Sequence, residues 1–319
     1  MPKRSRNDGY IPVTDRKRYP TLWFDDGNIV LTTNVSQFRV HRSLLSMNSP
    51  VFADMFSMPQ TDRLEDTVEG LPVVEISDDD TDLTHLLYFF YDHRYYQGGT
   101  ETTFEKISGL LRMGTKYQMD DLRNEIIDHL SLAYPSTLEK YLKAVNPKTR
   151  LPLFPPFLGQ HFAIVNLARE TDASILLPAA LWRSTCMITF DIVEGPEDST
   201  GTKYILFPTD VKRCIQQKSN SYKMLMKMEH SLPDVPKASE CCPPKDEGSV
   251  GTCREVASST VLHHFSISGP EIRDDIDFFT QMDAFEVWRS LVCTSCRKWG
   301  RFKALSLACE WVEHVASSI

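Results

Sequence analysis

Cysteine is the residue of this sequence with the most distinctive chemistry, and two of the eight cysteines stand close together as Cys293-x-x-Cys296. This spacing allows two thiolates to bind one tetrahedral zinc ion. Two more ligands could come from the segment upstream, which contains Cys241, Cys242 and Cys253. The pattern therefore predicts a structural zinc site formed by Cys242, Cys253, Cys293 and Cys296, with Cys241 able to take the place of Cys242.

A second interpretation of the same cysteines stays open. The upstream spacing is irregular, and residues three apart on a helix share one face, so Cys293 and Cys296 could instead be small apolar residues of a helix.

Disulfides are not expected. The N-terminus carries charges without an apolar segment after them, and no apolar run approaches the ~18 residues of a membrane span. We therefore expect an intracellular protein, cytoplasmic or nuclear, with no membrane partner and with reduced thiols.

Histidine offers the other candidate for chemistry, because His41 stands beside Arg42. No nucleophile motif and no second titrating group is placed near it by the sequence, so a hydrogen-bonded structural histidine is expected. The chain also lacks the Gly-x-Ser-x-Gly, P-loop, dinucleotide-glycine and His-Glu-x-x-His patterns. We predict no catalytic residue and no cofactor site. An enzyme based on Cys293 or Cys296 remains the weaker alternative.

The stretch that carries His41, from residue 37 to residue 56, changes from alternation to helical spacing. Phe38 and Val40 face away from Arg39 and His41, as in a strand. The later apolar residues recur at helical spacing: Val51, Phe52, Met55 and Phe56. Ser49 suits an N-cap and Pro50 suits the first helical position, where its missing N–H would have no partner. A strand is therefore predicted to lead into helices, one of which begins at Pro50.

This stretch resembles the entry to a BTB/POZ domain, in which a strand ending in an apolar-His-Arg turn leads to a short helix and then to Ser-Pro-x-Phe-x-x-Met-Phe. The resemblance covers roughly residues 20–134. Asn28 departs from it, since many BTB domains carry at this position an aspartate close to the histidine, and asparagine supplies no negative charge. The chain is similar to BTB proteins of mushroom-forming (basidiomycete) fungi. The family implies a self-associating platform, often a homodimer through the first helix and the N-terminal strand.

Apolar periodicity predicts the same domain in the same order. Strands are expected over residues 29–33, 38–41 and 73–76, and helices follow Asp78–Asp80, whose charges suit a helix N-terminus. The predicted core consists of Phe38, Val40, Leu44, Val51, Phe52, Val74, Leu83, Leu87 and Leu110. The fold class is therefore α+β, with a small sheet and a cluster of helices.

Three parts of the chain are distinguished by composition. Residues 1–18 are expected to be a flexible basic arm, and residues 19–134 the BTB/POZ domain. Residues 135–319 are expected to form a mostly helical domain with a mobile Pro- and Gly-containing loop at about 231–251. The helices predicted in this domain cover residues 157–170, 175–187, 210–228, 278–292 and 301–315.

Charge and motif content favour a non-catalytic protein–protein interaction protein. The net charge of −8 and pI near 5.6 argue against nucleic acid as a partner. We expect a homodimer formed through the BTB domain, with Trp23 and Phe24 as interface anchors, because aromatic residues are favoured at interface centres. The alternatives are an adaptor for a cullin-type ubiquitin ligase and a transcriptional regulator.

Overall fold

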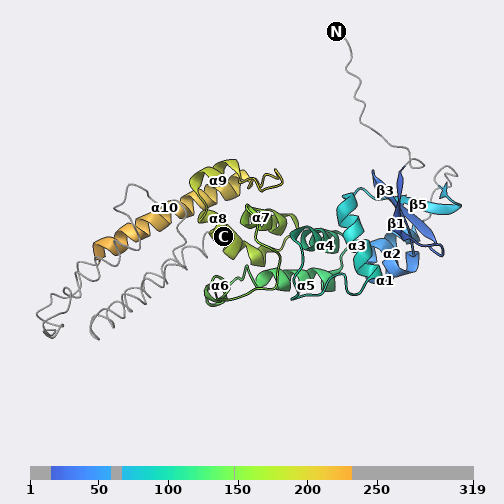
Figure 1. Cartoon of the computed structure of the whole chain (residues 1–319), viewed down its shortest axis with the longest axis horizontal. Coiled ribbons are helices and arrows are strands. Elements are labelled where there is room, and N and C mark those ends of the chain that lie inside the picture. Colours follow the sequence, from blue (N-terminus) through green and yellow to red (C-terminus); the bar gives the residue numbers. More distant parts are fainter. Residues whose placement is uncertain (1–15, 59–66, 147, 232–319) are drawn as a thin grey trace, which may run out of the picture. The chain divides into compact units, whose positions relative to one another are not determined.

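The structure is a computed structural model that describes residues 16–58, 67–146 and 148–231 (Figure 1). The chain divides into two compact units. Unit 1 comprises Met1–Leu130 with Pro152–Pro155, and unit 2 comprises Ser131–Leu151 with Pro156–Ile319.

Unit 1 contains a small mixed sheet, with strand order β1-β3-β2-β5-β4 among the described residues. The strands are β1 (Lys17–Trp23), β2 (Ile29–Thr32), β3 (Ser36–Val40), β4 (Thr67–Val68) and β5 (Leu71–Glu75). Strands β2 and β3 correspond to the strands predicted over 29–33 and 38–41, and they form an antiparallel hairpin with Ile29 opposite Val40 and Leu31 opposite Phe38. Strand β1 lies parallel to β3, and β5 lies parallel to β2. The α+β class is confirmed.

Three of the described helices of unit 1 begin after a residue whose side chain caps them, namely Ser49, Asp79 and Thr103. The helices of this unit are α1 (Arg42–Asn48), α2 (Pro50–Ser57), α3 (Asp80–Tyr91), α4 (Phe104–Lys116) and α5 (Asp120–Ser131). The predicted start at Pro50 is confirmed, because the Ser49 hydroxyl accepts from the Phe52 N–H at 3.1 Å. The same hydroxyl donates to the Tyr117 carbonyl oxygen at 2.7 Å, so this cap also ties α2 to the end of α4.

Most of the predicted core is buried, namely Phe38, Val40, Phe52, Leu83, Leu87 and Leu110. Leu44, Val51 and Val74 are half-buried instead, and this part of the prediction is wrong. On α1 the fully buried residue is Leu45, because a shift of one position rotates a helical side chain by about 100°. Val74 lies on β5, whose outer neighbour β4 has two residues and covers it incompletely.

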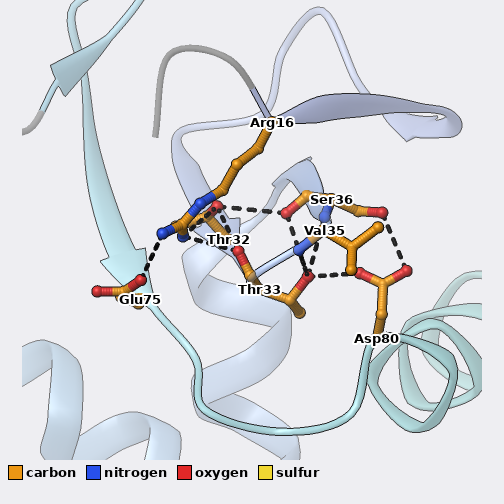
Figure 2. A network of polar contacts seen from close by, with 7 residues as sticks. All are labelled: Arg16, Thr32, Thr33, Val35, Ser36, Glu75 and Asp80. Atoms are coloured by element: carbon orange, nitrogen blue, oxygen red, sulfur yellow. Dashed lines mark hydrogen bonds and ion pairs between the residues drawn. The ribbon is translucent and has the colours of Figure 1, made fainter. Parts of the chain in front are cut away.

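The start of the sheet differs from the expected arm. Residue 18 was the predicted end of the arm, but β1 begins at Lys17 and the Arg16 side chain is buried. Its guanidinium donates to the Thr33 carbonyl oxygen at 2.7 Å and lies 2.7 Å from the Glu75 carboxylate (Figure 2). Arg16 therefore joins the β2–β3 turn to β5. The rest of the predicted arm lies outside the described residues.

The same turn is bound to helix α3. The Asp80 carboxylate accepts from the Ser36 hydroxyl at 2.9 Å and from the Thr33 hydroxyl (Figure 2). Thr33 also accepts from the Ser36 N–H at 2.9 Å, which closes the turn between the strands. One carboxylate at a helix N-terminus thus orients both hydroxyls of the turn, where the helix dipole favours its negative charge.

Unit 2 is helical in its described part. Its elements are α6 (Leu138–Ala144), α7 (Gln160–Glu170), the 3₁₀ turn η2 (Ser174–Leu176), α8 (Leu177–Thr185), α9 (Thr189–Glu194) and α10 (Pro208–Ser231). Helices α7 and α10 both pack on α8. The predicted helices over 157–170, 175–187 and 210–228 correspond to α7, α8 and α10, whereas α6 and α9 were not predicted. The loop predicted at 231–251 and the helices at 278–292 and 301–315 lie outside the described residues.

A buried polar cluster lies inside unit 2. The Tyr134 hydroxyl and the His161 Nδ1 atom are 2.9 Å apart, and the Gln160 amide donates to that hydroxyl at 3.3 Å. Burial lowers the pKa of His161 to about 3, and the nearby Arg183 guanidinium acts in the same direction. His161 is therefore neutral. Because the Tyr134 hydroxyl oxygen already accepts from Gln160, its O–H is placed to donate a hydrogen bond to the His161 Nδ1 atom.

We expect Leu87→Asp to unfold unit 1. The Leu87 side chain is fully buried, and the variant loses about 1.5–3 kcal/mol of apolar burial and also buries a carboxylate without a partner. Met58→Asp is the control, because Met58 is 66% exposed. Circular dichroism should show a wild-type melting transition for the control and a lost or strongly lowered one for Leu87→Asp. Equal transitions would show that the assignment of this helix face is wrong.

We also expect unit 2 to lose stability on acidification. His161 binds a proton in the unfolded chain below its ordinary pKa of 6.5 but stays neutral in the folded chain down to about pH 3. The free energy of unfolding should therefore fall as the pH falls below 6.5, by roughly 1–2 kcal/mol between about pH 8 and pH 5. Urea unfolding at both pH values measures this loss. His161→Gln should show a smaller loss, and an unchanged pH dependence would contradict the assignment.

Candidate functional site

Strand β1 forms one edge of the sheet in unit 1. Among the described residues it pairs with β3 alone, in a parallel register that is irregular between Arg18 and Trp23. Pro20 interrupts the row of N–H donors within the strand, which is tolerated at an edge. An edge strand can add a further strand through its unpaired backbone groups. The β1 edge is therefore a place where a second chain can pair.

The two predicted interface residues, Trp23 and Phe24, have different surroundings. Trp23 is half-buried, and the Arg18 guanidinium lies 4.6 Å from its ring centroid. Phe24 is also half-buried, but its ring lies 4.3 Å from the ring of Tyr91 and 5.5 Å from that of His41. Trp23 is therefore covered by a surface side chain, whereas Phe24 belongs to an aromatic cluster within unit 1.

His41 connects this aromatic cluster to the start of helix α1. Its backbone N–H donates to the Tyr91 hydroxyl oxygen at 2.9 Å, and its Nδ1 atom lies 2.9 Å from the same oxygen. Its Nε2 atom lies 3.2 Å from the Asp26 carboxylate. All three contacts are satisfied together when Tyr91 donates to Nδ1 and Nε2–H donates to Asp26. His41 thus has the structural, hydrogen-bonded role that the sequence predicts.

The negative charge beside His41 comes from a residue that the sequence analysis did not consider. Asn28 was expected to occupy the position near the histidine, but its Oδ1 atom accepts from the backbone N–H of Arg42 at 2.8 Å. Asn28 therefore satisfies a free donor at the start of α1. The charge is supplied by Asp26, two positions earlier. Asp26 lies in the turn between β1 and β2, so local spacing in the sequence contained no signal for this contact.

Helix α1 presents a second apolar feature, centred on Met47. Its side chain is 84% exposed, and Leu44, three residues earlier on the same face, is half-buried. Leu45 anchors the opposite side of the helix in the core. A long apolar side chain that unit 1 leaves in solvent is suited to a partner surface. Leu44 was predicted to lie in the core, and Met47 was not among the predicted interface residues.

The predicted zinc ligands Cys242, Cys253, Cys293 and Cys296 lie outside the described residues. Within the described ranges, no group of three or more His, Cys, Asp or Glu side chains could hold a metal ion. Burial raises the pKa of the Cys214 thiol to about 11, so this cysteine is a poor nucleophile and metal ligand. The zinc site stays a prediction, which elemental analysis of the purified chain for zinc would test.

Comparison with protein families identifies a BTB/POZ domain model that matches residues 25–132. The sheet and helices α1 to α5 of unit 1 fall within or beside this range, so the N-terminal part of the chain is a BTB domain with a small mixed sheet and helices. BTB domains are protein–protein interaction modules and are generally non-catalytic. No curated protein matches the chain, and the similarity to fungal BTB proteins stays a prediction. Among the described helices, none is both long and apolar enough to cross a membrane.

Tyr91→Phe should destabilise unit 1 by about 1–3 kcal/mol, because it removes the oxygen that accepts from the His41 backbone N–H and binds its ring. Asp26→Asn is the matched comparison. The Asp26 side chain is 86% exposed, and an exposed ion pair contributes less than about 1 kcal/mol. Urea unfolding at neutral pH measures both free energies. An Asp26→Asn variant that is less stable than Tyr91→Phe would contradict the proposed hydrogen-bonding pattern.

Proposed function

We propose that this chain is a non-catalytic, intracellular scaffold protein that forms a homodimer through its BTB domain and binds another protein through unit 2. The observation that carries this proposal is the match of residues 25–132 to a BTB/POZ domain together with the exposed apolar side chain of Met47 on α1. BTB domains associate with themselves and with other proteins. Dimerisation gives one scaffold two copies of any surface on unit 2, which strengthens binding to a partner with repeated sites.

Two elements of unit 1 are suited to a two-fold interface. Strand β1 offers backbone donors and acceptors at the sheet edge, and Trp23 stands at the end of that strand. Helix α1 offers Met47, with Leu44 beside it. In a two-fold dimer the same surface patch of both copies forms the interface, so β1 and α1 of each copy both contribute to the buried area. A stable dimer of this kind buries about 1,200–2,000 Å² in total.

Phe24 is a weaker choice of anchor than Trp23. Its ring packs on Tyr91 within unit 1, so its truncation would destabilise the BTB domain as well as an interface. The Trp23 ring contacts the guanidinium of Arg18, which also lies 2.7 Å from the Glu69 carboxylate in an exposed ion pair. Exposed ion pairs of this kind contribute less than about 1 kcal/mol, so displacing Arg18 when another chain approaches costs little. We therefore propose Trp23 and Met47 as the residues whose substitution separates association from folding.

Adaptor activity for a cullin-type ubiquitin ligase and a role in transcription are two forms that such a scaffold could take. Both require a partner on unit 2 or on the BTB domain, and both keep the chain non-catalytic. Affinity purification of the full chain followed by identification of the bound proteins separates them. A cullin among the bound chains would favour the adaptor.

Light scattering across a concentration series tests the dimer. We expect wild-type protein at micromolar concentration to have twice the chain mass of 36.5 kDa. Met47→Asp and Trp23→Ala should shift the dissociation constant upward at least tenfold, which corresponds to about 1.4 kcal/mol. Met58→Asp is the control, since Met58 is 66% exposed and lies after α2 rather than on α1.

Two outcomes would contradict the proposal. A wild-type chain that stays monomeric at tens of micromolar would exclude self-association at the proposed strength. If Met58→Asp and Met47→Asp raised the dissociation constant of the dimer equally, α1 would not be part of the interface. The circular dichroism spectrum of each variant must match that of wild type, so that a loss of mass is not a loss of folding.

A further inference from the structure

A second exposed apolar surface lies on unit 2, which the scaffold hypothesis leaves without an assigned occupant. Four large side chains are exposed by more than half, namely Phe190 (69%), Val193 (52%), Ile205 (57%) and Phe207 (56%). The first two belong to helix α9 and the last two to the segment that leads into helix α10. We call these four residues the α9 surface.

The fold brings the two halves of the α9 surface together. A Cβ atom at Gly195, the residue after α9, would lie 3.0 Å from the Ile205 side chain, so this glycine allows the segment to pass directly beside the helix end. The Tyr204 N–H donates to the Pro196 carbonyl oxygen at 2.9 Å, which fixes the same approach. The Asn166 amide on α7 donates to the Ile205 carbonyl oxygen at 2.9 Å.

Alternation along this segment directs both of its apolar side chains outward. Leu206 is 3% exposed, whereas Ile205 and Phe207 on either side of it are exposed. On α9, Ile192 is 1% exposed, whereas Val193 is exposed. The buried leucine and isoleucine hold each element in place. The exposed residues therefore form a surface fixed by the fold, not side chains of a free loop.

Acidic residues surround this apolar surface. Glu194 ends helix α9 and Glu197 follows it, and both are exposed. Asp191 is half-buried on the same helix. Asp198 in the following loop is also half-buried, and the exposed basic residues of these segments include Lys203, which forms an isolated β-bridge with Glu197, and Lys212 on α10. The surroundings are therefore net acidic, and they favour an occupant that is apolar and basic.

The chain itself contains such an occupant beyond the described residues. Residues 297–303 read Arg-Lys-Trp-Gly-Arg-Phe-Lys, with four basic side chains, two aromatic side chains and no acidic one. The other aromatic stretch, residues 271–288, contains Glu271, Asp274, Asp275, Asp277, Asp283 and Glu286. Repulsion from Glu194 and Glu197 would disfavour that stretch at the α9 surface. Of these two aromatic stretches, residues 297–303 therefore have the charge that complements the α9 surface.

The connection is long enough for this segment to return. Helix α10 has 24 residues and is therefore about 36 Å long at ~1.5 Å per residue. It packs on α9, and Lys218 donates to the carbonyl oxygen of Met187, just before α9, at 2.8 Å. More than sixty residues separate Ser231 from Arg297, and such a chain can extend over about 200 Å. The distance back along α10 is therefore no obstacle.

We propose that residues 297–303 bind the α9 surface of the same chain, with Trp299 and Phe302 on its apolar residues and the basic side chains beside Glu194 and Glu197. The bound segment covers apolar area that unit 2 otherwise exposes to water. It occupies a surface that a basic, aromatic segment of another protein would also fit, so an external partner of this kind competes with the chain's own segment.

Site-specific photo-cross-linking in the full-length chain tests this contact. Benzoylphenylalanine replacing Phe190 should, on irradiation, give a product of monomer mass whose cross-linked peptide contains residues 297–303. The same reagent replacing Ile175 is the matched control, because Ile175 is 49% exposed and lies on η2. Cross-linking at position 175 should not give that peptide.

Charge reversal tests the role of the acidic residues. Glu194→Lys combined with Glu197→Lys should lower the yield of the 297–303 cross-link severalfold, and adding Arg301→Glu with Lys303→Glu should restore it. Three results would overturn the proposal. The reagent at position 190 could cross-link to a peptide other than 297–303, the cross-linked product could have the mass of a dimer, or the reagent at position 175 could give the same 297–303 peptide. An unchanged yield after charge reversal would overturn the electrostatic part, since direct ion pairing requires opposite charges.

Discussion

The burial of strand β2 on both faces is the constraint from which the BTB domain is assembled. All four of its residues are buried, so it must have a strand on each side and cover above and below. Strand β3 supplies one neighbour through the hairpin, and β5 supplies the other in parallel. The polar end of the hairpin is then held by two charged groups. Arg16, which precedes β1, binds it and also reaches Glu75 on β5, and Asp80 binds it from the start of α3 (Figure 2). Because both groups act on the same turn, the register of the hairpin also fixes where α3 begins.

This assembly explains why the surfaces suited to partners lie at the periphery of each unit. In unit 1, β1 is added outside β3, and α1 follows β3 directly, so both stand at the margin of the buried centre. In unit 2, α9 is held to α10 and to the segment before it by Leu206, Ile192 and the close approach at Gly195. In each case buried residues fix an element whose other side is exposed. A protein that binds others needs such preorganised surfaces, since ordering them on binding would cost conformational entropy.

Folding lowers the proton affinity of a histidine in each of the two units. In unit 2, His161 is neutral inside the helices, and folding excludes the proton that the unfolded chain binds. In unit 1, burial likewise lowers the pKa of His85 on α3. The cause is solvation, because a buried imidazole loses the water that would stabilise its charge. Each unit therefore contains a histidine whose protonation opposes folding.

The sequence by itself determined the BTB domain, because its signals are local. Alternation at Phe38 and Val40, the cap at Ser49 and the apolar spacing of α3 each depend on near neighbours in the chain, and the structure confirms the elements they predict.

Tertiary structure decided what depends on distant residues. Arg16 belongs to the sheet because Thr33 and Glu75 accept its protons, and Asp26 rather than Asn28 meets His41 because the strand and the turn place it there. Leu45 rather than Leu44 enters the core, and Gly195 allows Ile205 beside α9. Local spacing contains no information about such contacts, since they are defined only when segments far apart in the sequence pack together.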